Sequence, residues 1–374
     1  MLRGIVIGTG WAGEGYVTAL RQADVDVVAL CGRSPEPAHA MGVRLGIADV
    51  RTDWRSAIDD LTPDLVVVAT PAEPHCGMVE YAAERGAHVA CEKPLGRNAD
   101  EGRRMLTAVE GAGVKHAYGT TTRYAPGLPQ ARALIVDGGI GEVQELEVVD
   151  HFGMSPLHPY SWIHSLHLGG GLLFNAYTHF LAQSQYVTGG VARSATGRTE
   201  RGVAEVPVGR PVHDFREWDP IDPAEAAAGE WRENDADLSA TVITGLELPD
   251  GREVPALFRV SAFTGARAPG YLAVYGSTGT LHLEGQPWFN HLQHFIADDN
   301  RWVDVAIPTV DDPIQSGWNQ LVAHLVADIQ GTDDSEYPTF RDGYAANLLI
   351  DQVRAADGAA GAPFADARHS ATVH

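Results

Sequence analysis

The sequence predicts an α/β protein: an N-terminal doubly wound parallel sheet, followed by a second α/β domain with a large, mostly antiparallel open sheet. Three observations predict this fold class. The chain has 374 residues, more than one hydrophobic core usually holds. Its first third alternates short apolar runs with amphipathic stretches long enough to connect parallel strands. From residue 123 onward the pattern changes to longer strands with alternating polarity.

The first domain is expected to span residues 1–122. Its strands are predicted at residues 5–7, 27–31, 65–69, 87–91 and 114–118. Helices are predicted between them at residues 13–22, 35–45, 75–85 and 100–112. Because each helical stretch follows one apolar run and precedes the next, the strands are expected to pair in parallel, with helices on both faces of the sheet.

The second domain is expected to span residues 123–356. A helix at 129–136 is stopped by two glycines, a half-exposed strand follows at 141–149, and several strands lie beyond residue 237. Two closing helices are predicted at 317–329 and 341–354. Residues 191–235 show no sustained periodicity and are expected to form a long loop or a short excursion without chemistry. The Ala/Gly-rich residues 357–374 are expected to fray.

Composition excludes several classes of function. The 49 acidic and 27 basic residues give a formal charge of -22, which repels phosphate backbones and anionic membranes, so we expect no nucleic acid or membrane partner. No apolar run reaches the roughly 20 residues of a membrane helix. The start of the chain leaves no room for a signal peptide before the first strand. Cys31, Cys76 and Cys91 are expected to be buried free thiols, and the protein to be cytoplasmic.

A glycine turn follows the first strand directly and opens the first helix. Gly8 allows a tight turn, Gly10 lets a pyrophosphate approach the backbone, and Gly13 lets helix and strand pack closely. The helix N-terminus, with Trp11 and Ala12, then faces the phosphates. This spacing in a strand–turn–helix context predicts a Rossmann dinucleotide site, against the alternative of a purely structural turn.

The end of the second strand favours NADP over NAD. An NAD site typically has an acidic residue there, which binds the ribose diol. This strand instead runs into Gly32, Arg33 and Ser34. With no carboxylate to repel it, a 2'-phosphate can bind the Arg33 guanidinium and the Ser34 hydroxyl. In the alternative interpretation, Ser34 merely caps the following helix and Arg33 is a solvated side chain.

Two further strand ends carry residues that we expect to line the cofactor crevice of the doubly wound sheet and to contact the dinucleotide. Thr70 and Pro71, with His75, follow one strand, and Glu92 and Lys93 follow the next. The chain contains only two lysines, Lys93 and Lys115. An ammonium group at this position can stabilise negative charge on a reacting oxygen, so Lys93 is predicted to be catalytic. The alternative is a structural Lys–Glu pair.

Taken together, these motifs resemble the glucose-fructose oxidoreductase / inositol dehydrogenase / rhizopine catabolism (Gfo/Idh/MocA) family. The resemblance also rests on Arg123-Tyr124 with Pro126, on the glycines at 138–141 and 169–171, on His179, and on Tyr275-Gly276 with Gly279. It implies a Rossmann domain and a second α/β domain that binds substrate and forms subunit contacts. The implied reaction is hydride transfer between a nicotinamide and a sugar, cyclitol or related carbonyl compound. The resemblance also implies that Arg123 contributes to the cofactor site, that Lys93 binds the reacting oxygen and that His179 exchanges its proton.

The sequence departs from the family pattern at Asn175. Family members that oxidise sugars and cyclitols typically carry aspartate four residues before the histidine. Asn175 and His179 are spaced to share one helix face, so both can reach one substrate. An amide cannot accept a proton as a carboxylate does, which favours the carbonyl-reducing direction. A second departure is Ile163 after Trp162, where many sugar-active relatives have arginine.

The predicted substrate is a polyol or keto-sugar. Its contacts are expected from Lys93, Tyr160, Trp162, Asn175, Tyr177 and His179. Five histidines lie between residues 151 and 179, but their spacing fits no zinc pattern, and we predict no metal site. Two other functions remain open: a redox-neutral enzyme that processes a glycoside with tightly held nicotinamide, and a non-catalytic NADP-responsive binding protein. A homodimer or homotetramer is expected, because the resemblance implies an open second sheet.

Overall fold

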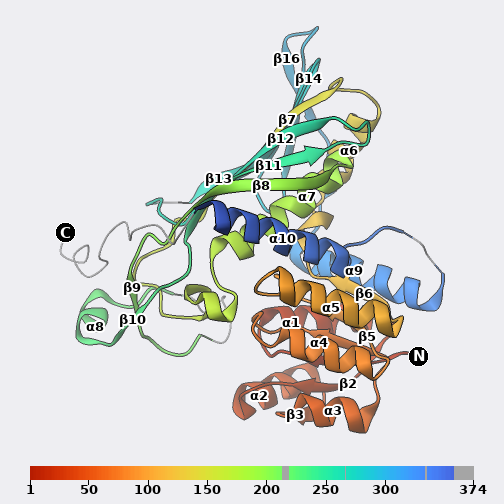
Figure 1. Ribbon diagram of the computed structural model, residues 1–374, viewed down its shortest axis with the longest axis vertical. Helices are drawn as coiled ribbons and strands as arrows, with labels where there is room; N and C mark the ends of the chain where they lie inside the picture. Colours follow the sequence, from red (N-terminus) through yellow and green to blue (C-terminus); the bar gives the residue numbers. More distant parts are fainter. Residues whose placement is uncertain (213–218, 266, 333–334, 358–374) are drawn as a thin grey trace.

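The computed structural model describes residues 1–212, 219–265, 267–332 and 335–357. It contains a six-stranded parallel sheet, an eight-stranded and mostly antiparallel sheet, and a separate two-stranded sheet. Figure 1 shows the parallel sheet with its helices at one end of the long axis and the large sheet at the other. The predicted α/β fold class is confirmed.

The six-stranded sheet has the strand order β3-β2-β1-β4-β5-β6, and every neighbouring pair is parallel. Its strands are β1 (Arg3–Ile7), β2 (Asp26–Cys31), β3 (Val50–Arg51), β4 (Leu65–Val68), β5 (His88–Cys91) and β6 (His116–Tyr118). Its helices are α1 (Trp11–Gln22), α2 (Pro35–Leu45), α3 (Trp54–Leu61), α4 (His75–Glu84) and α5 (Ala99–Ala112). The strand order reverses between β1 and β4, where a doubly wound sheet binds its ligand.

Separate hydrophobic clusters cover the two faces of this sheet. One joins the sheet to α4 and α5, and the other joins it to α1 and to α9 (Pro313–Gln330). Trp318 of α9 fits so closely over α1 that a Cβ on Gly15 would lie 2.1 Å from its ring. The helix predicted at 317–329 is confirmed, but it packs on the first domain's sheet although its residues belong to the range expected for the second domain.

The eight-stranded sheet has the order β16-β15-β14-β13-β7-β12-β11-β8, in which only β7 and β12 pair in parallel. Its strands are β7 (Val143–His151), β8 (Val191–Glu200), β11 (Ser239–Glu247), β12 (Glu253–Ser261), β13 (Ala268–Gly276), β14 (Gly279–Glu284), β15 (His291–Ile296) and β16 (Arg301–Val305). Helices α6 (Gly127–Val136), α7 (Thr178–Thr188) and α10 (Phe340–Asp357) share a hydrophobic cluster with this sheet. Ile243 and Trp302 of the sheet are about half exposed, at 51% and 48%.

The expectation of a long loop or short excursion over residues 191–235 is wrong at its start. Residues 191–200 form β8, a ten-residue edge strand whose mostly polar sequence hid its pairing with β11. The described part of the remainder holds β9 (Glu205–Pro207), α8 (Pro223–Ala228) and β10 (Trp231–Glu233). The prediction of a frayed tail at 357–374 falls outside the described residues after Asp357, the last residue of α10.

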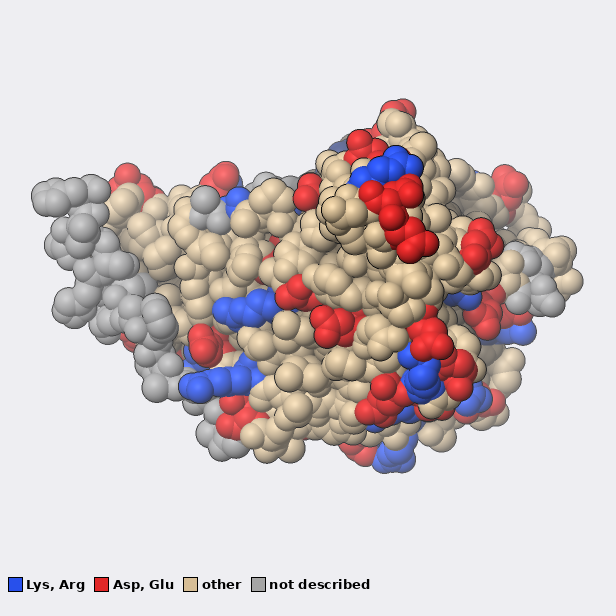
Figure 2. All heavy atoms as spheres, turned by 90° about the horizontal axis from the view of Figure 1, so that it is seen from above, with Lys and Arg blue, Asp and Glu red and all other residues tan. Residues whose placement is uncertain are grey.

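Acidic and basic side chains are intermixed on the surface shown in Figure 2, and broad uncharged areas separate their groups. All three cysteines are buried free thiols, as the sequence predicts. Among the described residues, no helix combines the length and the apolar character that a membrane crossing needs.

Candidate active site

The glycine turn after β1 has the geometry of a dinucleotide cradle. Gly8 has a φ of +135°, and a Cβ there would lie 2.2 Å from the carbonyl oxygen of Ala69. A Cβ on Gly13 would lie 2.1 Å from the carbonyl oxygen of Gly8. Gly10 is the N-cap of α1, and its neighbours Trp11 and Ala12 are partly exposed. Only glycine fits these two contacts, and the helix N-terminus they position suits a pyrophosphate.

The end of β2 carries an exposed cation and an uncommitted hydroxyl. Arg33 is exposed, and Ser34 is the N-cap of α2 but makes no side-chain capping hydrogen bond. The alternative interpretation, in which the Ser34 hydroxyl only caps the helix, requires a hydrogen bond from a backbone N–H of α2 to this hydroxyl, and Ser34 does not make that bond. Arg51 of the adjacent β3 is held by the carboxylates of Asp49 and Asp60, at 2.8 and 2.7 Å.

His75 joins two loops at the edge of the crevice. Its imidazole is completely buried, with Nε2 2.8 Å from the carbonyl oxygen of Thr70 and Nδ1 3.1 Å from those of Pro94 and Leu95. Burial lowers the pKa of His75, and a neutral ring donates from only one of its two nitrogens. The predicted cofactor residue thus lies between the loop after β4, which carries Thr70 and exposed Pro71, and the loop that follows Lys93.

Glu92 and Lys93 point to different surroundings. The Glu92 carboxylate is buried, accepts hydrogen bonds from Trp318 Nε1 at 3.2 Å and from the Lys93 backbone N–H at 3.1 Å, and has a pKa raised by burial. Lys93 is partly exposed, and its Nζ donates to Asn175 Oδ1 at 3.1 Å. Burial lowers the pKa of Lys93, and the negative charge of Glu92 opposes this. Glu92, predicted near the cofactor, packs against α9, whereas Lys93 reaches the second domain.

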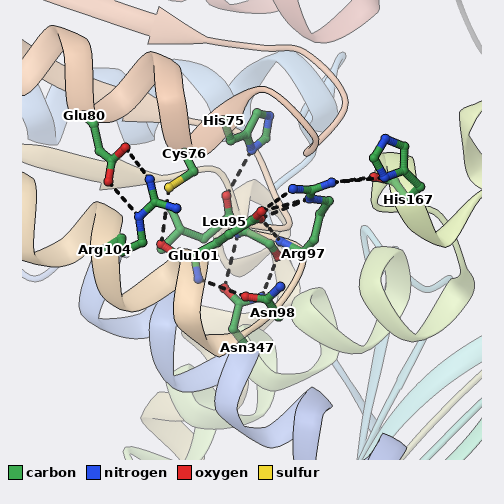
Figure 3. Close-up of polar contacts among 11 residues, drawn as sticks. His75, Cys76, Glu80, Leu95, Arg97, Asn98, Glu101, Arg104, His167 and Asn347 are labelled. Carbon is green, nitrogen blue, oxygen red and sulfur yellow. Dashed lines mark hydrogen bonds and ion pairs between the residues drawn. The ribbon is translucent and has the colours of Figure 1, made fainter.

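The loop after Lys93 is fixed by α10 and α5. Asn347 of α10 accepts from the Gly96 N–H at 3.2 Å and donates to the Gly96 carbonyl at 2.7 Å. Arg97 pairs with Glu101 of α5, and its guanidinium also contacts the His167 carbonyl at 3.2 Å. Figure 3 shows these contacts converging on the loop, with His167 reaching it from the second domain. The backbone that carries Lys93 is therefore held from both domains.

Asn175 and His179 lie one turn apart at the start of α7. Residues Leu173–Tyr177 form a π-helical turn, a feature frequent at functional sites. Asn175 Nδ2 donates to the Gly171 carbonyl at 2.7 Å, which leaves Oδ1 to accept from Lys93. His179 is partly exposed, and its Nδ1 has no hydrogen-bond partner among the described residues. Burial and the nearby Lys93 charge hold the pKa of His179 well below its usual value, so its imidazole is neutral.

The other predicted site residues are more dispersed. Tyr160 stacks on His164 with ring centroids 5.9 Å apart and lines a hollow of about 300 Å³ with Arg232, Glu233 and Asp235. Trp162 is partly exposed at the start of a 3-10 turn. Tyr177 is buried in the second core, where its hydroxyl lies 2.6 Å from Thr244 Oγ1, so it does not lie beside Asn175. Arg123 donates to the Glu336 carbonyl at 3.2 Å and lies over the Tyr186 ring.

Three supporting residues were not predicted: Asn347, Asp237 and Arg354. Asn347 lies on the buried, otherwise mostly apolar face of a predicted helix. A polar residue in such a position was the one feature of the sequence that could have indicated its supporting role. Asp237 accepts from the Leu173 N–H at 2.7 Å and is buried. Arg354 lies over the Phe174 ring, 4.2 Å from its centroid. Neither of these two has a motif around it that indicates its role.

The cradle, the crevice and the Lys93–Asn175 contact define the class of a nicotinamide-dependent oxidoreductase. The model described as "Oxidoreductase family, NAD-binding Rossmann fold" matches residues 2–120, and that of the "GFO/IDH/MocA C-terminal domain" matches residues 128–282. The chain belongs to the Gfo/Idh/MocA oxidoreductase family. The resemblance drawn from the sequence motifs is confirmed.

Relatives of known activity act on sugars and cyclitols. The chain is 32% identical to levoglucosan dehydrogenase of Pseudarthrobacter phenanthrenivorans over 159 residues, which cover 42% of this chain and 41% of that protein. It is 28% identical to inositol 2-dehydrogenase of Rhizobium meliloti over 218 residues, covering 58% and 62%. These matches thus span less than two thirds of either relative.

Solved structures share the fold over nearly the whole chain. A levoglucosan dehydrogenase in complex with NADH and L-sorbose superimposes with a TM-score of 0.81 at 21% identity, covering 96% of this chain and 97% of that one. An oxidoreductase domain protein from Kribbella flavida gives a TM-score of 0.80 at 25% identity, with the same coverage.

Proposed function

We propose that this protein is an NADP(H)-dependent oxidoreductase that transfers hydride between nicotinamide and a sugar-like or cyclitol-like alcohol/ketone pair. The observation that carries this proposal is the contact of Lys93 Nζ with Asn175 Oδ1, with His179 one helical turn away. It brings a hydrogen-bond donor, a neutral imidazole and an amide together beside the cofactor crevice. The dehydrogenase activities of the relatives support the same class of substrate.

The dinucleotide fits the residues around Gly8, Gly10 and Gly13, where the backbone leaves no room for side chains. When bound, the nicotinamide accepts or supplies the hydride. Lys93 donates a hydrogen bond from Nζ to the substrate oxygen and stabilises negative charge on it. His179, neutral because it is desolvated beside a cation, accepts the hydroxyl proton on oxidation and passes it to solvent. On reduction it first takes up a proton from solvent and then donates it to the reacting oxygen. Asn175 orients the substrate and Lys93 but carries no proton.

The first test measures turnover with a panel of polyols and keto-sugars, using NADPH and NADH. Lys93→Ala is expected to lower kcat at least a hundredfold and to leave nucleotide affinity within about threefold, because Lys93 acts on the reacting oxygen. Lys115→Ala is the matched control, since the other lysine forms an exposed ion pair with Asp328 at 2.7 Å. Nucleotide binding without turnover of any polyol would refute the proposal and favour a binding protein.

Preference for NADP is a separate part of the proposal. It is supported by the exposed Arg33, by the Ser34 hydroxyl that makes no capping bond and by the lack of an acidic residue at the end of β2. NADPH is expected to bind at least tenfold more tightly than NADH, about 1.4 kcal/mol, when nicotinamide fluorescence is titrated. Arg33→Ala should abolish the difference, and Arg103→Ala on α5 should keep it. Equal affinities for both nucleotides in the wild type would contradict this assignment.

We further propose that the protein is a homodimer or homotetramer. Ile243 and Trp302 expose apolar surface on the eight-stranded sheet. Helices α6, α7 and α10 share a hydrophobic cluster with the buried residues of the same sheet. Sedimentation of the wild type beside Trp302→Glu tests this assignment. A monomeric wild type at micromolar concentration would refute it.

A further inference from the structure

The turn that carries Asn175 is anchored at its base by Asp237. The Asp237 carboxylate accepts from the Leu173 N–H at 2.7 Å, and its backbone carbonyl accepts from the Leu172 N–H at 2.8 Å. These are two successive N–H groups at the beginning of the π-helical turn, where a helix lacks partners of its own. A carboxylate at this end also interacts favourably with the helix dipole. Asp237 therefore fixes where the turn begins.

Gly171 leaves room for this anchor. It has a φ of +98°, and a Cβ there would lie 2.5 Å from Asp237 Oδ1. Its carbonyl oxygen accepts from both the backbone N–H and the side-chain Nδ2 of Asn175, at 3.1 and 2.7 Å. Gly171 therefore lies against the Asp237 carboxylate and, through its carbonyl oxygen, also orients the Asn175 amide.

Arg354 of α10 provides the nearby positive charge. Its guanidinium lies over the Phe174 ring, and its charge lowers the pKa of Asp237, against the larger effect of burial, which raises that pKa. Burial also lowers the pKa of Arg354 itself. Removing Asp237 alone takes away one of the negative charges that act on Arg354, the others being Asp351 and Asp235, whereas removing Asp237 and Arg354 together keeps the local charge balance. Comparing the single and double variants therefore separates the effect of the lost charge balance from the effect of the lost hydrogen bond between the Leu173 N–H and the Asp237 carboxylate.

We propose that Asp237 is a positioning residue: through the Leu173 N–H and the Gly171 peptide it aims the Asn175 amide at Lys93 and so at the reacting oxygen of the substrate. This inference rests on the proposed function for its catalytic consequence. Asp237 itself has no role in proton transfer, because its carboxylate is buried beneath the turn. Asp237 lies just beyond residues 191–235, to which the sequence assigned no chemistry, and thereby supports the active site.

The same short segment also holds the neighbouring loop. Asp235 Oδ1 accepts from the Leu166 N–H at 2.7 Å, and the Asp235 N–H donates to the His164 carbonyl at 3.2 Å. That loop carries His167, which contacts Arg97 near Lys93 (Figure 3). Residues 235–237 thus fix the two segments on either side of the glycines at 169–171.

The test compares Asp237→Ala, Arg354→Met and the double variant with the wild type. Asp237→Ala is expected to lower kcat at least tenfold and to leave NADPH affinity within about twofold. The double variant should recover part of the melting temperature that Asp237→Ala loses, because the Leu173 N–H stays unpaired, and should not recover kcat. Asp222→Ala is the matched control, because Asp222 caps the distant helix α8 through the Ala224 N–H at 2.8 Å. Its kcat should match the wild type.

A second measurement does not need a substrate. With only two lysines in the chain, acetylation of Lys93 relative to Lys115 can be followed by peptide mass spectrometry. Displacing Asn175 removes an acceptor from the Lys93 ammonium, so the Lys93/Lys115 labelling ratio should rise at least threefold at neutral pH in Asp237→Ala and in the double variant. If Asp237→Ala does not fold, the double variant carries the test.

Two outcomes would overturn the inference: a double variant that recovers kcat together with the melting temperature, or a labelling ratio within error of the wild type in both variants. A wild type that binds NADPH but turns over no polyol would refute the proposed function instead. The labelling ratio would still decide whether Asp237 positions Asn175.

Discussion

Replacing Asn175 by aspartate tests what the amide at this position does to Lys93 and to the direction of the reaction, since many relatives carry a carboxylate there. The substitution places a negative charge where Oδ1 now lies, 3.1 Å from Lys93 Nζ. Opposite charges about 4 Å apart attract by about 4 kcal/mol at an effective dielectric constant near 20. Desolvation of the new carboxylate and loss of the bond from Nδ2 to the Gly171 carbonyl lower the stability of the folded variant, the second by about 1–3 kcal/mol. Both costs are the same whether Lys93 is charged or neutral.

The hydrogen bond that the ammonium now donates to Asn175 Oδ1 already contributes about 1.5–3 kcal/mol. We therefore expect the Lys93 ammonium to be stabilised by roughly a further 1–2 kcal/mol in Asn175→Asp, and each 1.4 kcal/mol multiplies the ratio of ammonium to free amine about tenfold. Acetylation of Lys93 relative to Lys115 should slow by about that factor at fixed pH. The carboxylate also favours the imidazolium form of His179, which forms when His179 accepts a proton on oxidation. At saturating substrate, kcat for alcohol oxidation should rise relative to kcat for carbonyl reduction.

Asn98→Asp is the matched control, because it makes the same change at the exposed N-cap of α5, at the far end of the Lys93 loop. It should leave both kcat values and the labelling ratio unchanged. The values of kcat are compared because the ratio of kcat/KM in the two directions is set by the equilibrium constant and cannot differ between variants. The reasoning is refuted if Asn175→Asp changes both kcat values by the same factor or leaves Lys93 labelling unaltered.

Three further changes test the fold around the site. Gly13→Ala should weaken nucleotide binding at least tenfold in a fluorescence titration, because its Cβ would lie 2.1 Å from the Gly8 carbonyl oxygen, whereas Gly111→Ala, which meets nothing within 4 Å, should bind normally. Asn347→Leu should lower the free energy of unfolding by about 2–4 kcal/mol in urea, since it leaves the buried Gly96 N–H and carbonyl unpaired; a loss under 1 kcal/mol would contradict this. Asp150, whose pKa burial raises from 3.8 to about 6, binds a proton more tightly in the folded than in the unfolded state, so its contribution to stability is complete below pH 4 and is lost as the pH rises to 6. Asp150→Asn should therefore stabilise the protein at pH 8 by up to roughly 3 kcal/mol and much less at pH 4; equal effects at both pH values would contradict the assignment.

The sequence predicts the first domain well because its signals are local. Each strand is a continuous apolar run, and Gly8 and Gly13 are needed for contacts made within the same strand–turn–helix unit. Two elements of this domain were not predicted. Strand β3 has two residues, too few to form a pattern, and without it the short helix α3 that follows was not recognised as a separate element. The edge strand β8 was missed because its exposed positions are polar and its pairing with β11 spans about 45 residues of chain, which no local pattern reports.

For the site, the sequence identified the groups but not how they are held. Lys93 was conspicuous as one of two lysines, and the spacing of Asn175 and His179 predicted a shared helix face. That Lys93 contacts Asn175 depends on 82 residues of intervening chain. Tyr177 was also predicted to contact the substrate, but it packs in the core against Thr244. It lies two residues after Asn175, and residues two apart on a helix do not share a face, so the helical count that joins Asn175 to His179 also separates Tyr177 from them.

Helix α10 connects the two halves of the site. Asn347 binds the Gly96 peptide in the loop that carries Lys93, and Arg354 packs on Phe174 in the turn that carries Asn175. These residues are seven apart on one helix and so lie on the same face, two turns from each other. The rigid spacing of one helix therefore sets the separation between the two loops, from opposite domains, that meet at the Lys93–Asn175 hydrogen bond. The site is therefore complete only when α10 has packed against both domains.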